Sequence, residues 1–479
     1  MLWLCAWLPR LGLDCIDRLR EAGAAPAVLT GSRSGREQVL LADERARVHG
    51  VHPGLSLSAA LALCPGLAAL PRNEQTERAA LERLASWAGR FTSRVCLAPP
   101  DAMLLEIGGS LVLFGGLEKL VGGIGQGLEA LGYRALLATA PTPLAAEWLA
   151  RSGSCRHCPS REALPGAVAD LPLGVLVPEG RDRSGLAGMG LRTVGDLLAQ
   201  PRDGLGRRFG PWLVDALDRA LGVVPDPRPV FEPPARFRAA AELPSETADT
   251  TALLFPLGRL LDELSAVLQG RCRVVQSLHL ELCRRGEGKT DVSLALGRAT
   301  ADGTYLLALL RERLERVRPG APVTGLVLES GVLLSAAGES GTLFGPDTGA
   351  AELEALLDRL RARLGEAAVE GIAPAADHRP ERAWCRVAAG QAGPAGGSDG
   401  RPLWLLPEPR RLETRSGRPW LDGPLRLSGR AERIESGWWD GGGIRREYYR
   451  ALDAAGARLW VYRDLAMEDE QWYLHGLFA

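Results

Sequence analysis

The stretch VCLAPPDAMLLEIGGS, Val95–Ser110, predicts two strands joined by a tight turn. Apolar residues on both sides favour the strands, and Pro99-Pro100 followed by Asp101 favours the turn. An aspartate at such a turn can bind a divalent cation if carboxylates from other strands converge on it, because hard cations need several oxygen ligands. Ala102 follows Asp101, so the adjacent carboxylate that such a site would use is missing.

The length and composition indicate a multidomain globular protein without a membrane span. A chain of 479 residues is too long for one core, so three or four domains are expected. No apolar run reaches the roughly 18 residues that a transmembrane helix needs. The apolar N-terminus has no preceding basic region and is interrupted by Asp14 and Asp17, which argues against a signal peptide. We therefore expect a cytoplasmic protein that does not contact membranes.

The cysteines indicate neither disulfides nor a metal site. Nine cysteines are scattered along the chain, and an odd number in an unsecreted protein favours reduced thiols. The only close pair is Cys155 and Cys158, and one pair does not supply the four ligands of a structural zinc site. The sequence therefore predicts no metal and no cofactor, and a surface loop at this pair.

Beyond the hairpin, composition separates the chain into segments. Residues 223–237, VVPDPRPVFEPPARF, are rich in proline and predict a linker. Strands and helices alternate after it, which favours a compact domain with a sheet on one side. Residues 388–402 are rich in glycine and small residues, and we expect them to be disordered. From Arg379 to Arg450 there are 14 arginines against 9 acidic residues, which suggests either a phosphate-contacting tail or a solvated one.

The order of these motifs resembles the Y-family translesion DNA polymerases, and more narrowly their ImuB branch, whose members have lost catalytic carboxylates. The family's first aspartate-bearing strand corresponds to LCAWLPRL, with Ala6 and Leu8 at the acidic positions. Its second motif corresponds to PPDAMLLE, where Asp101 retains a metal-ligand position and Ala102 replaces the essential glutamate. The resemblance thus implies that one of three catalytic carboxylates survives, and that the protein is not an active polymerase.

The resemblance also implies the fold, an α+β multidomain chain of palm, fingers, thumb and little finger with a loop-rich C-terminal extension. Its implied parts are palm and fingers at 1–165 (fingers about 15–75), a small helical thumb at 166–225 with a helix-hairpin-helix remnant, an α/β little-finger domain at 235–335, a clamp-binding loop at 336–350 and a partner-docking extension at 351–479.

The contacts that such polymerases make with an incoming nucleotide are altered here. The family's YEAR motif corresponds to ERAR, Glu44–Arg47, in which Arg47 is retained and the tyrosine has become Glu44. A later lysine of the family corresponds to Glu147. Two carboxylates near a site for a triphosphate would repel nucleotide.

DNA contacts are expected in the thumb and in the little finger. Gly188 and Gly190, in LAGMGLRTVGDLLAQ, match the second half of a helix-hairpin-helix, which grips phosphates through backbone N–H groups; a tight turn between packed helices would look the same. Arginines around the first hairpin of the little finger favour phosphate contact, although a solvated strand face would also carry them. They are Arg271, Arg273, Arg284 and Arg285.

Two further segments suggest protein partners. SGTLF, whose residues are Ser340, Gly341, Thr342, Leu343 and Phe344, is similar to the pentapeptide by which translesion polymerases bind the sliding clamp, although Ser340 replaces the anchoring glutamine. The alternative is a loop whose Leu343 and Phe344 pack on the core. The tail, including AERIESGWWD, resembles the ImuB tail, which implies an error-prone C-family DNA polymerase and an ImuA-type RecA-like protein as partners. Its candidate docking aromatics are Trp438, Trp439, Tyr448, Tyr449, Trp460 and Trp472.

Three functions remain open from the sequence. The resemblance favours a non-catalytic adaptor in DNA-damage-induced (SOS) mutagenesis that links the sliding clamp, DNA and an error-prone polymerase for translesion synthesis. The first alternative is an active polymerase in which Asp14 or Asp17 joins Asp101 in a rearranged metal site. The second is a scaffold that binds only proteins; the tail aromatics, interleaved with arginine, would serve as interface anchors or would stack on single-stranded DNA.

Overall fold

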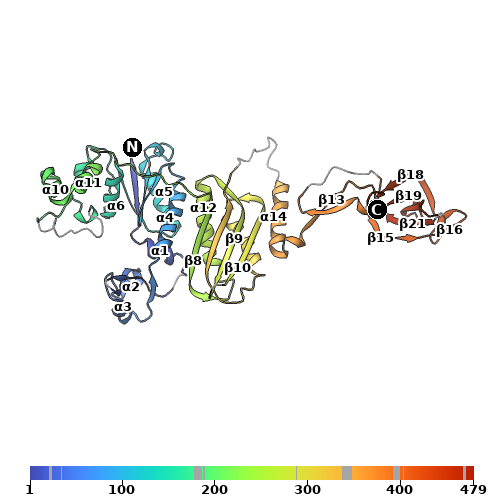
Figure 1. Ribbon diagram of the computed structural model, residues 1–479, viewed down its shortest axis with the longest axis horizontal. Helices are drawn as coiled ribbons and strands as arrows, with labels where there is room; N and C mark the ends of the chain where they lie inside the picture. Colours follow the sequence, from blue (N-terminus) through green and yellow to red (C-terminus); the bar gives the residue numbers. More distant parts are fainter. Residues whose placement is uncertain are drawn as a thin grey trace. The chain divides into compact units, whose positions relative to one another are not determined.

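A computed structural model of the chain describes residues 1–20, 24–33, 35–176, 186, 189–286, 288–336, 348–391, 400–402, 404–467 and 471–478. The chain divides into two compact units, Met1–Arg363 (unit 1) and Leu364–Ala479 (the second unit). Helices and sheets are mixed in the first unit, whereas strands dominate the second (Figure 1). No described helix combines the length and the apolar character that a membrane span requires.

The first sheet of unit 1 has the antiparallel order β5-β6-β1-β7. One of its faces packs against α4 and α5, and the other packs against α6. The predicted hairpin is present, with Asp101 in the turn between its strands, so that prediction is confirmed. The elements are β1 (Trp3–Trp7), α4 (Glu74–Ala88), β5 (Val95–Ala98), β6 (Ala102–Glu106), α5 (Leu117–Ala130), β7 (Leu136–Ala140) and α6 (Pro143–Arg151).

Two smaller groups of elements complete this half of unit 1. A three-stranded sheet, β3-β2-β4, carries two short helices on its own small apolar core. Its elements are β2 (Ala27–Arg33), β3 (Arg36–Ala42), α2 (Glu44–Val48), α3 (Leu57–Leu63) and β4 (Ala68–Pro71), preceded by α1 (Leu11–Asp17). The second group is helical and extends the core beneath α6. It comprises α7 (Leu164–Ala169), α9 (Val194–Leu198), α10 (Arg202–Phe209) and α11 (Pro211–Leu221).

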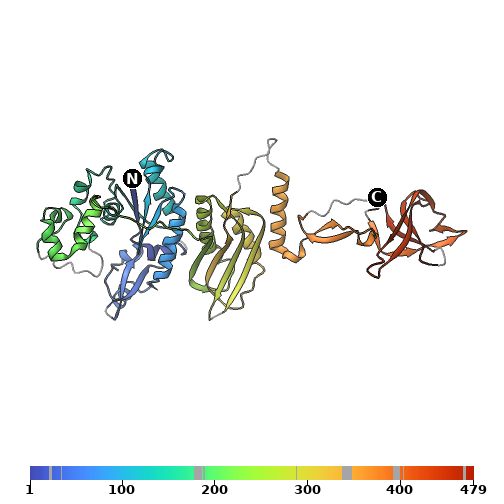
Figure 2. The ribbon, with the colours of Figure 1, turned by 45° about the horizontal axis from the view of Figure 1, so that its top comes forward.

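After an extended segment at 223–235, a second antiparallel sheet follows in the order β10-β9-β11-β8, with β12 paired to β9. Figure 2 shows its long strands side by side. Apolar residues of α12 and α13 join the core of the first sheet's helices, so both sheets share one continuous core. The elements are β8 (Arg236–Thr247), α12 (Leu254–Gly270), β9 (Arg273–Arg284), β10 (Lys289–Thr300), α13 (Gly303–Leu314), β11 (Val323–Val332), β12 (Leu334–Ser335) and α14 (Thr348–Leu364).

The second unit is more regular than the loop-rich extension that the sequence predicted. Its centre is a five-stranded antiparallel sheet, β15-β21-β20-β19-β18, with a separate apolar cluster on each face. Of the segment expected to be disordered, residues 392–399 lie outside the described residues. The elements are β13 (Glu370–Pro374), β14 (Trp384–Ala388), β15 (Trp404–Arg411), β16 (Glu413–Arg415), β17 (Arg418–Trp420), β18 (Arg426–Ser436), β19 (Ile444–Leu452), β20 (Arg458–Asp464) and β21 (Gln471–Leu477).

Candidate functional site

Asp101 is held by two side chains that the sequence reasoning did not identify. The Nε1–H of Trp7 on β1 donates to Oδ2 of Asp101 at 2.9 Å. A guanidinium nitrogen of Arg151, at the end of α6, lies 3.0 Å from Oδ1. Arg151 also pairs with Glu147 at 3.1 Å, one helical turn earlier. Burial lowers the pKa of Arg151, but Asp101 and Glu147 outweigh burial and the net pKa is raised. A fixed cation therefore already balances the charge of this aspartate.

The strand β1 presents Trp7, and not Ala6 or Leu8, towards Asp101. Successive side chains of a strand point to opposite faces of the sheet. Ala6 and Leu8 are fully buried in the core beneath α4, whereas Trp7 packs on the α6 side. Trp7, and neither Ala6 nor Leu8, is therefore the β1 side chain that contacts Asp101. Ala102 is fully buried on the α6 side.

The residues at this turn do not fit the divalent metal ions that a polymerase site would hold. Mg²⁺ takes an octahedral set of oxygen ligands and is usually held by carboxylates. The turn supplies one carboxylate, Asp101, and both of its oxygens are already engaged by Arg151 and Trp7. Within the described residues, no group of three or more His, Cys, Asp or Glu side chains is arranged to hold a metal ion.

The acidic residues that could have rearranged towards Asp101 instead bind arginines elsewhere. Asp14 accepts a hydrogen bond from the backbone N–H of Arg134 at 3.0 Å and lies 3.6 Å from Arg10. Asp17 pairs with Arg20 at 3.2 Å. Burial, the main cause, raises the pKa of Asp14 to about 6. Both carboxylates therefore belong to an ion-pair network along α1.

Glu44, from the segment expected to be a remnant of a nucleotide site, joins the same network. Glu44, expected to repel a triphosphate, pairs with Arg10 at 3.0 Å and with Arg134 at 2.9 Å. Those two arginines, together with a hydrogen bond from Arg134, lower the pKa of Glu44. Arg47, on the same helix α2, is exposed. Glu44 is therefore an ion-pair partner of two arginines that lie far from it in the sequence.

The arginines predicted to bind DNA do not form one group. Arg271 and Arg273 lie at the start of β9 and bind a backbone carbonyl and Ser335 Oγ, respectively, within the chain. Arg284 and Arg285 lie at its other end, roughly 35 Å away for a strand of this length. Arg284 donates to two backbone carbonyls of neighbouring loops, whereas Arg285 is exposed and lies 3.6 Å from Glu246. Their clustering around one hairpin is therefore wrong.

Several candidate residues lie outside the described part of the chain. They are Gly188 and the clamp-type pentapeptide Ser340, Gly341, Thr342, Leu343 and Phe344. Gly190 is described and has φ +74° in the turn before α9. A capping box begins α9, where the side chains of Thr193 and Asp196 each accept a hydrogen bond from the other residue's backbone N–H.

Most of the aromatic residues predicted to dock partners are core residues. Tyr448, Trp460 and Trp472 are at most 4% exposed, and Tyr449 is half-buried. Tyr448 stacks on Trp460 with ring centroids 4.0 Å apart. Tyr448, Trp460 and Trp472 therefore belong to the core around the second unit's sheet, whereas a docking role for the half-buried Tyr449 stays a prediction. Trp438 and Trp439 alone among these candidates are exposed.

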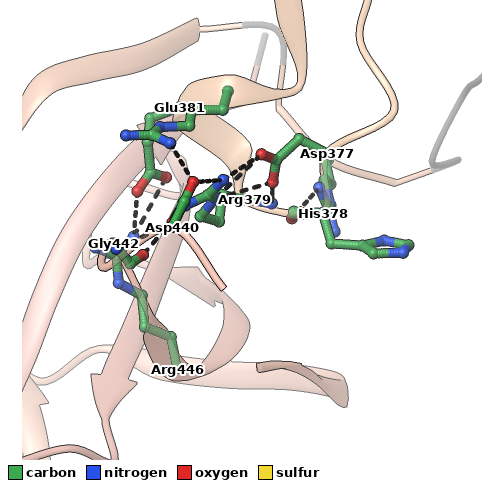
Figure 3. Close-up of polar contacts among 9 residues, drawn as sticks. Asp377, His378, Arg379, Glu381, Asp440, Gly442 and Arg446 are labelled. Carbon is green, nitrogen blue, oxygen red and sulfur yellow. Dashed lines mark hydrogen bonds and ion pairs between the residues drawn. The ribbon is translucent and has the colours of Figure 1, made fainter. Parts of the chain in front are cut away.

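A polar cluster in the second unit was not recognised from the sequence. Arg379, in the turn after β13, lies between Asp377 and Asp440 (Figure 3), and its nitrogens bind both carboxylates at 2.6 to 3.1 Å. Hydrogen bonds from Arg379 hold the pKa of Asp440 well below its usual range. Arg379 and Asp440 are 61 positions apart, so no local sequence pattern indicates that they pair.

The comparisons with known proteins agree with the motif order. Protein ImuB of Caulobacter vibrioides is 30% identical over 470 residues, which cover 90% of this chain and 100% of that protein. The chain belongs to the ImuB family. Residues 17–151 also match the impB/mucB/samB family. DNA polymerase IV of Dehalococcoides mccartyi is 28% identical over 262 residues, covering 52% of this chain and 66% of that protein.

Among solved structures, DinB from Sulfolobus solfataricus covers 70% of this chain and 100% of its own, with 16% identity and a TM-score of 0.39. At the level of the family, ImuB membership assigns the chain to DNA-damage-induced mutagenesis and translesion synthesis, and the polymerase relatives support DNA binding.

Proposed function

We propose that this ImuB-family chain is a non-catalytic adaptor, which brings an error-prone C-family polymerase to damaged DNA held by the sliding clamp. The observation that carries the proposal is the ion pair between Asp101 and Arg151. In a working polymerase, two metal ions bridge the attacking and leaving oxygens of the phosphoryl transfer. Here the guanidinium of Arg151 and the indole N–H of Trp7 bind the two carboxylate oxygens of Asp101 that such ions would need as ligands. The partner would carry out the synthesis.

The same proposal assigns roles to the remaining segments. Residues 1–165 are the palm and fingers, 166–225 the thumb and 235–335 the little finger, which contacts DNA backbone without performing chemistry. Ser340–Phe344 bind the sliding clamp, and the unit from 364 onward docks the C-family polymerase and an ImuA-type RecA-like protein. These are interactions of a cytoplasmic protein.

Primer extension by the purified chain tests the absence of catalysis. Undamaged and lesion-containing templates are supplied with Mg²⁺ or Mn²⁺, and Asp101→Ala and a mock purification serve as controls. The adaptor proposal expects no incorporation above the mock preparation in either metal. Incorporation that Asp101→Ala abolishes would overturn it and would favour an active polymerase.

Clamp binding needs a separate test. Deleting residues 340–344 should abolish capture of the chain by the immobilised clamp, whereas a deletion of 394–398 should not. Equal capture of both deletion variants would contradict a clamp peptide at 340–344. If the intact chain binds neither the clamp nor DNA, the result would favour the protein-only scaffold.

A further inference from the structure

The turn between β18 and β19, residues 437–443, is fastened by a single buried arginine. Arg379 is 3% exposed and donates to Asp377 and to both carboxylate oxygens of Asp440 in this turn (Figure 3). It also donates to the backbone carbonyl of Gly442 at 3.2 Å. The planar guanidinium has donors in a fixed fork, which suits two carboxylates at once. The turn is therefore held in one geometry by a residue from a distant segment.

The glycines of the turn are required by this close approach. Gly437 has φ +85°, and a Cβ there would lie 2.6 Å from the carbonyl oxygen of Gly442 as well as against Arg379. A Cβ at Gly442 would lie 3.1 Å from Arg379. Glycine permits both the left-handed backbone and the contact with the guanidinium. The polar cluster and the glycines therefore build the same rigid turn.

This turn carries two adjacent tryptophans whose side chains are exposed. Trp438 is 82% exposed and Trp439 is 61% exposed. Their rings meet edge to face, with centroids 5.5 Å apart and planes at 84°. Tryptophan is seldom left in water, and it is among the residues that contribute most to protein interfaces. A turn that is already rigid also loses little conformational entropy when its side chains are bound.

The charged residues around the tryptophans indicate the sign of the partner. Arg382, Arg433 and Arg445 have side chains that are 56 to 58% exposed. Glu435 is the exposed carboxylate that pairs with Arg433 and Arg445. Asp440 is shared between Arg379 and Arg382. Arg382, Arg433 and Arg445 are each more exposed than the carboxylate with which they pair, so these cations reach further into solvent and favour an acidic surface opposite them.

We propose that Trp438 and Trp439 form the anchor by which the second unit inserts into an apolar pocket with an acidic rim on a protein partner. The proposal rests on the adaptor function and narrows its docking surface from the whole tail to one turn. Stacking on single-stranded DNA fits less well. Successive bases stack on parallel aromatic faces, whereas these two rings are nearly perpendicular and the Arg379 guanidinium lies 5.9 Å from the ring centre of Trp439.

Binding measurements with full-length variants test the anchor. Trp438→Ala and Trp439→Ala are titrated with the purified C-family polymerase and, separately, with the RecA-like protein. Trp404→Ala is the matched control, because Trp404 is 67% exposed but lies on β15, away from the turn. Arg379→Lys keeps the charge and removes the fork, so it tests the positioning of the turn. Thermal unfolding of each variant checks that the second unit remains folded.

We expect each turn variant to weaken binding of one partner about tenfold or more, and Trp404→Ala to change it less than threefold. Added salt should weaken wild-type binding further, as an acidic rim requires. If the wild type binds but Trp438→Ala and Trp439→Ala bind equally well, the anchor is wrong and the adaptor function stands. If the wild type binds neither partner, the anchor and the adaptor function are both contradicted. If the turn variants lose affinity only for an oligo-dT strand, the site binds DNA instead.

Discussion

The carboxylate of Glu263 on α12 lies 2.8 Å from Nε of Arg83 on α4, although 180 positions separate the two residues. Arg18 pairs with the same carboxylate, and the Tyr133 hydroxyl donates to it at 3.1 Å. The side chains of Glu263 and Arg18 are 3 to 4% exposed. Burial on its own raises the pKa of Glu263, but Arg83 and Arg18 outweigh burial and the net pKa is lowered. One buried carboxylate therefore joins the helices that cover the two sheets of unit 1.

Glu263→Gln should lower the free energy of unfolding of unit 1 by about 3–5 kcal/mol, because two buried guanidinium groups would lose their only shared counter-charge. Urea denaturation measures the change. Glu82→Gln is the control, since Glu82 lies on α4 in a largely exposed pair with Arg78 and should change stability by less than about 0.5 kcal/mol. Equal effects of the two substitutions would contradict a structural role for the buried cluster.

Asp14 should make unit 1 more stable as the pH falls from 7 to 4. Its pKa is about 6 in the folded chain and 3.8 for an ordinary aspartate, so the folded state binds the proton first. The contribution of Asp14 to the free energy of unfolding is therefore present at pH values near and below 3.8 and is lost as the pH rises through 6. Relative to Asp14→Asn, the wild type should gain about 2–3 kcal/mol between pH 7 and pH 4.

Urea denaturation of both proteins across this pH range measures the difference. Arg10, Asp17 and Arg134 also face this carboxyl, so the comparison uses the difference between wild type and variant instead of either curve alone. A difference that does not vary with pH would mean that Asp14 ionises normally.

Arg151→Ala should destabilise unit 1 by about 1–2 kcal/mol, because it leaves Asp101 and Glu147 partly buried without their shared cation. Arg156→Ala is the matched control, since Arg156 lies 3.9 Å from Asp170 in an exposed pair. Differential scanning calorimetry measures the melting temperatures of the Arg151→Ala and Arg156→Ala variants. An unchanged melting temperature for Arg151→Ala would mean that the ion pair between Arg151 and Asp101 contributes nothing to folding.

His475 should remain neutral down to about pH 4. Burial lowers its pKa from 6.5 to about 4, and its Nδ1 lies 2.8 Å from the hydroxyl of the buried Tyr448. Because the unfolded chain takes up the proton first, the second unit should lose stability as the pH falls from 6.5 to 4. NMR titration of the imidazole measures the pKa directly. Titration near 6.5 would show that this side chain is solvated.

Local patterns predicted the local structure of this chain. The hairpin around Asp101 follows from residue types a few positions apart, and it is present. Long-range pairing was not predictable in the same way. Nothing in the sequence near Asp101 indicates that Arg151 reaches it, because the contact depends on how α6 packs against the sheet.

Strand alternation decides which side chains reach a site. On β1 it turns Trp7 towards Asp101 and buries Ala6 and Leu8 on the opposite face of the sheet. Tyr448 lies in a strand with its ring inward, whereas Trp438 lies in a glycine-rich turn and is exposed. Residue type alone does not distinguish an aromatic ring in a core from one presented to a partner.

The arrangement around Asp101 bears on how this chain can evolve. A new metal site there would require a carboxylate in place of Trp7 or Ala102 and removal of Arg151. Adding the carboxylate first brings it beside an aspartate that is already neutralised. Removing Arg151 first leaves Asp101 without its cation, while Glu147 keeps Arg228 at 3.6 Å. Neither single substitution creates a metal site, so a set of metal ligands at this turn would need both changes together.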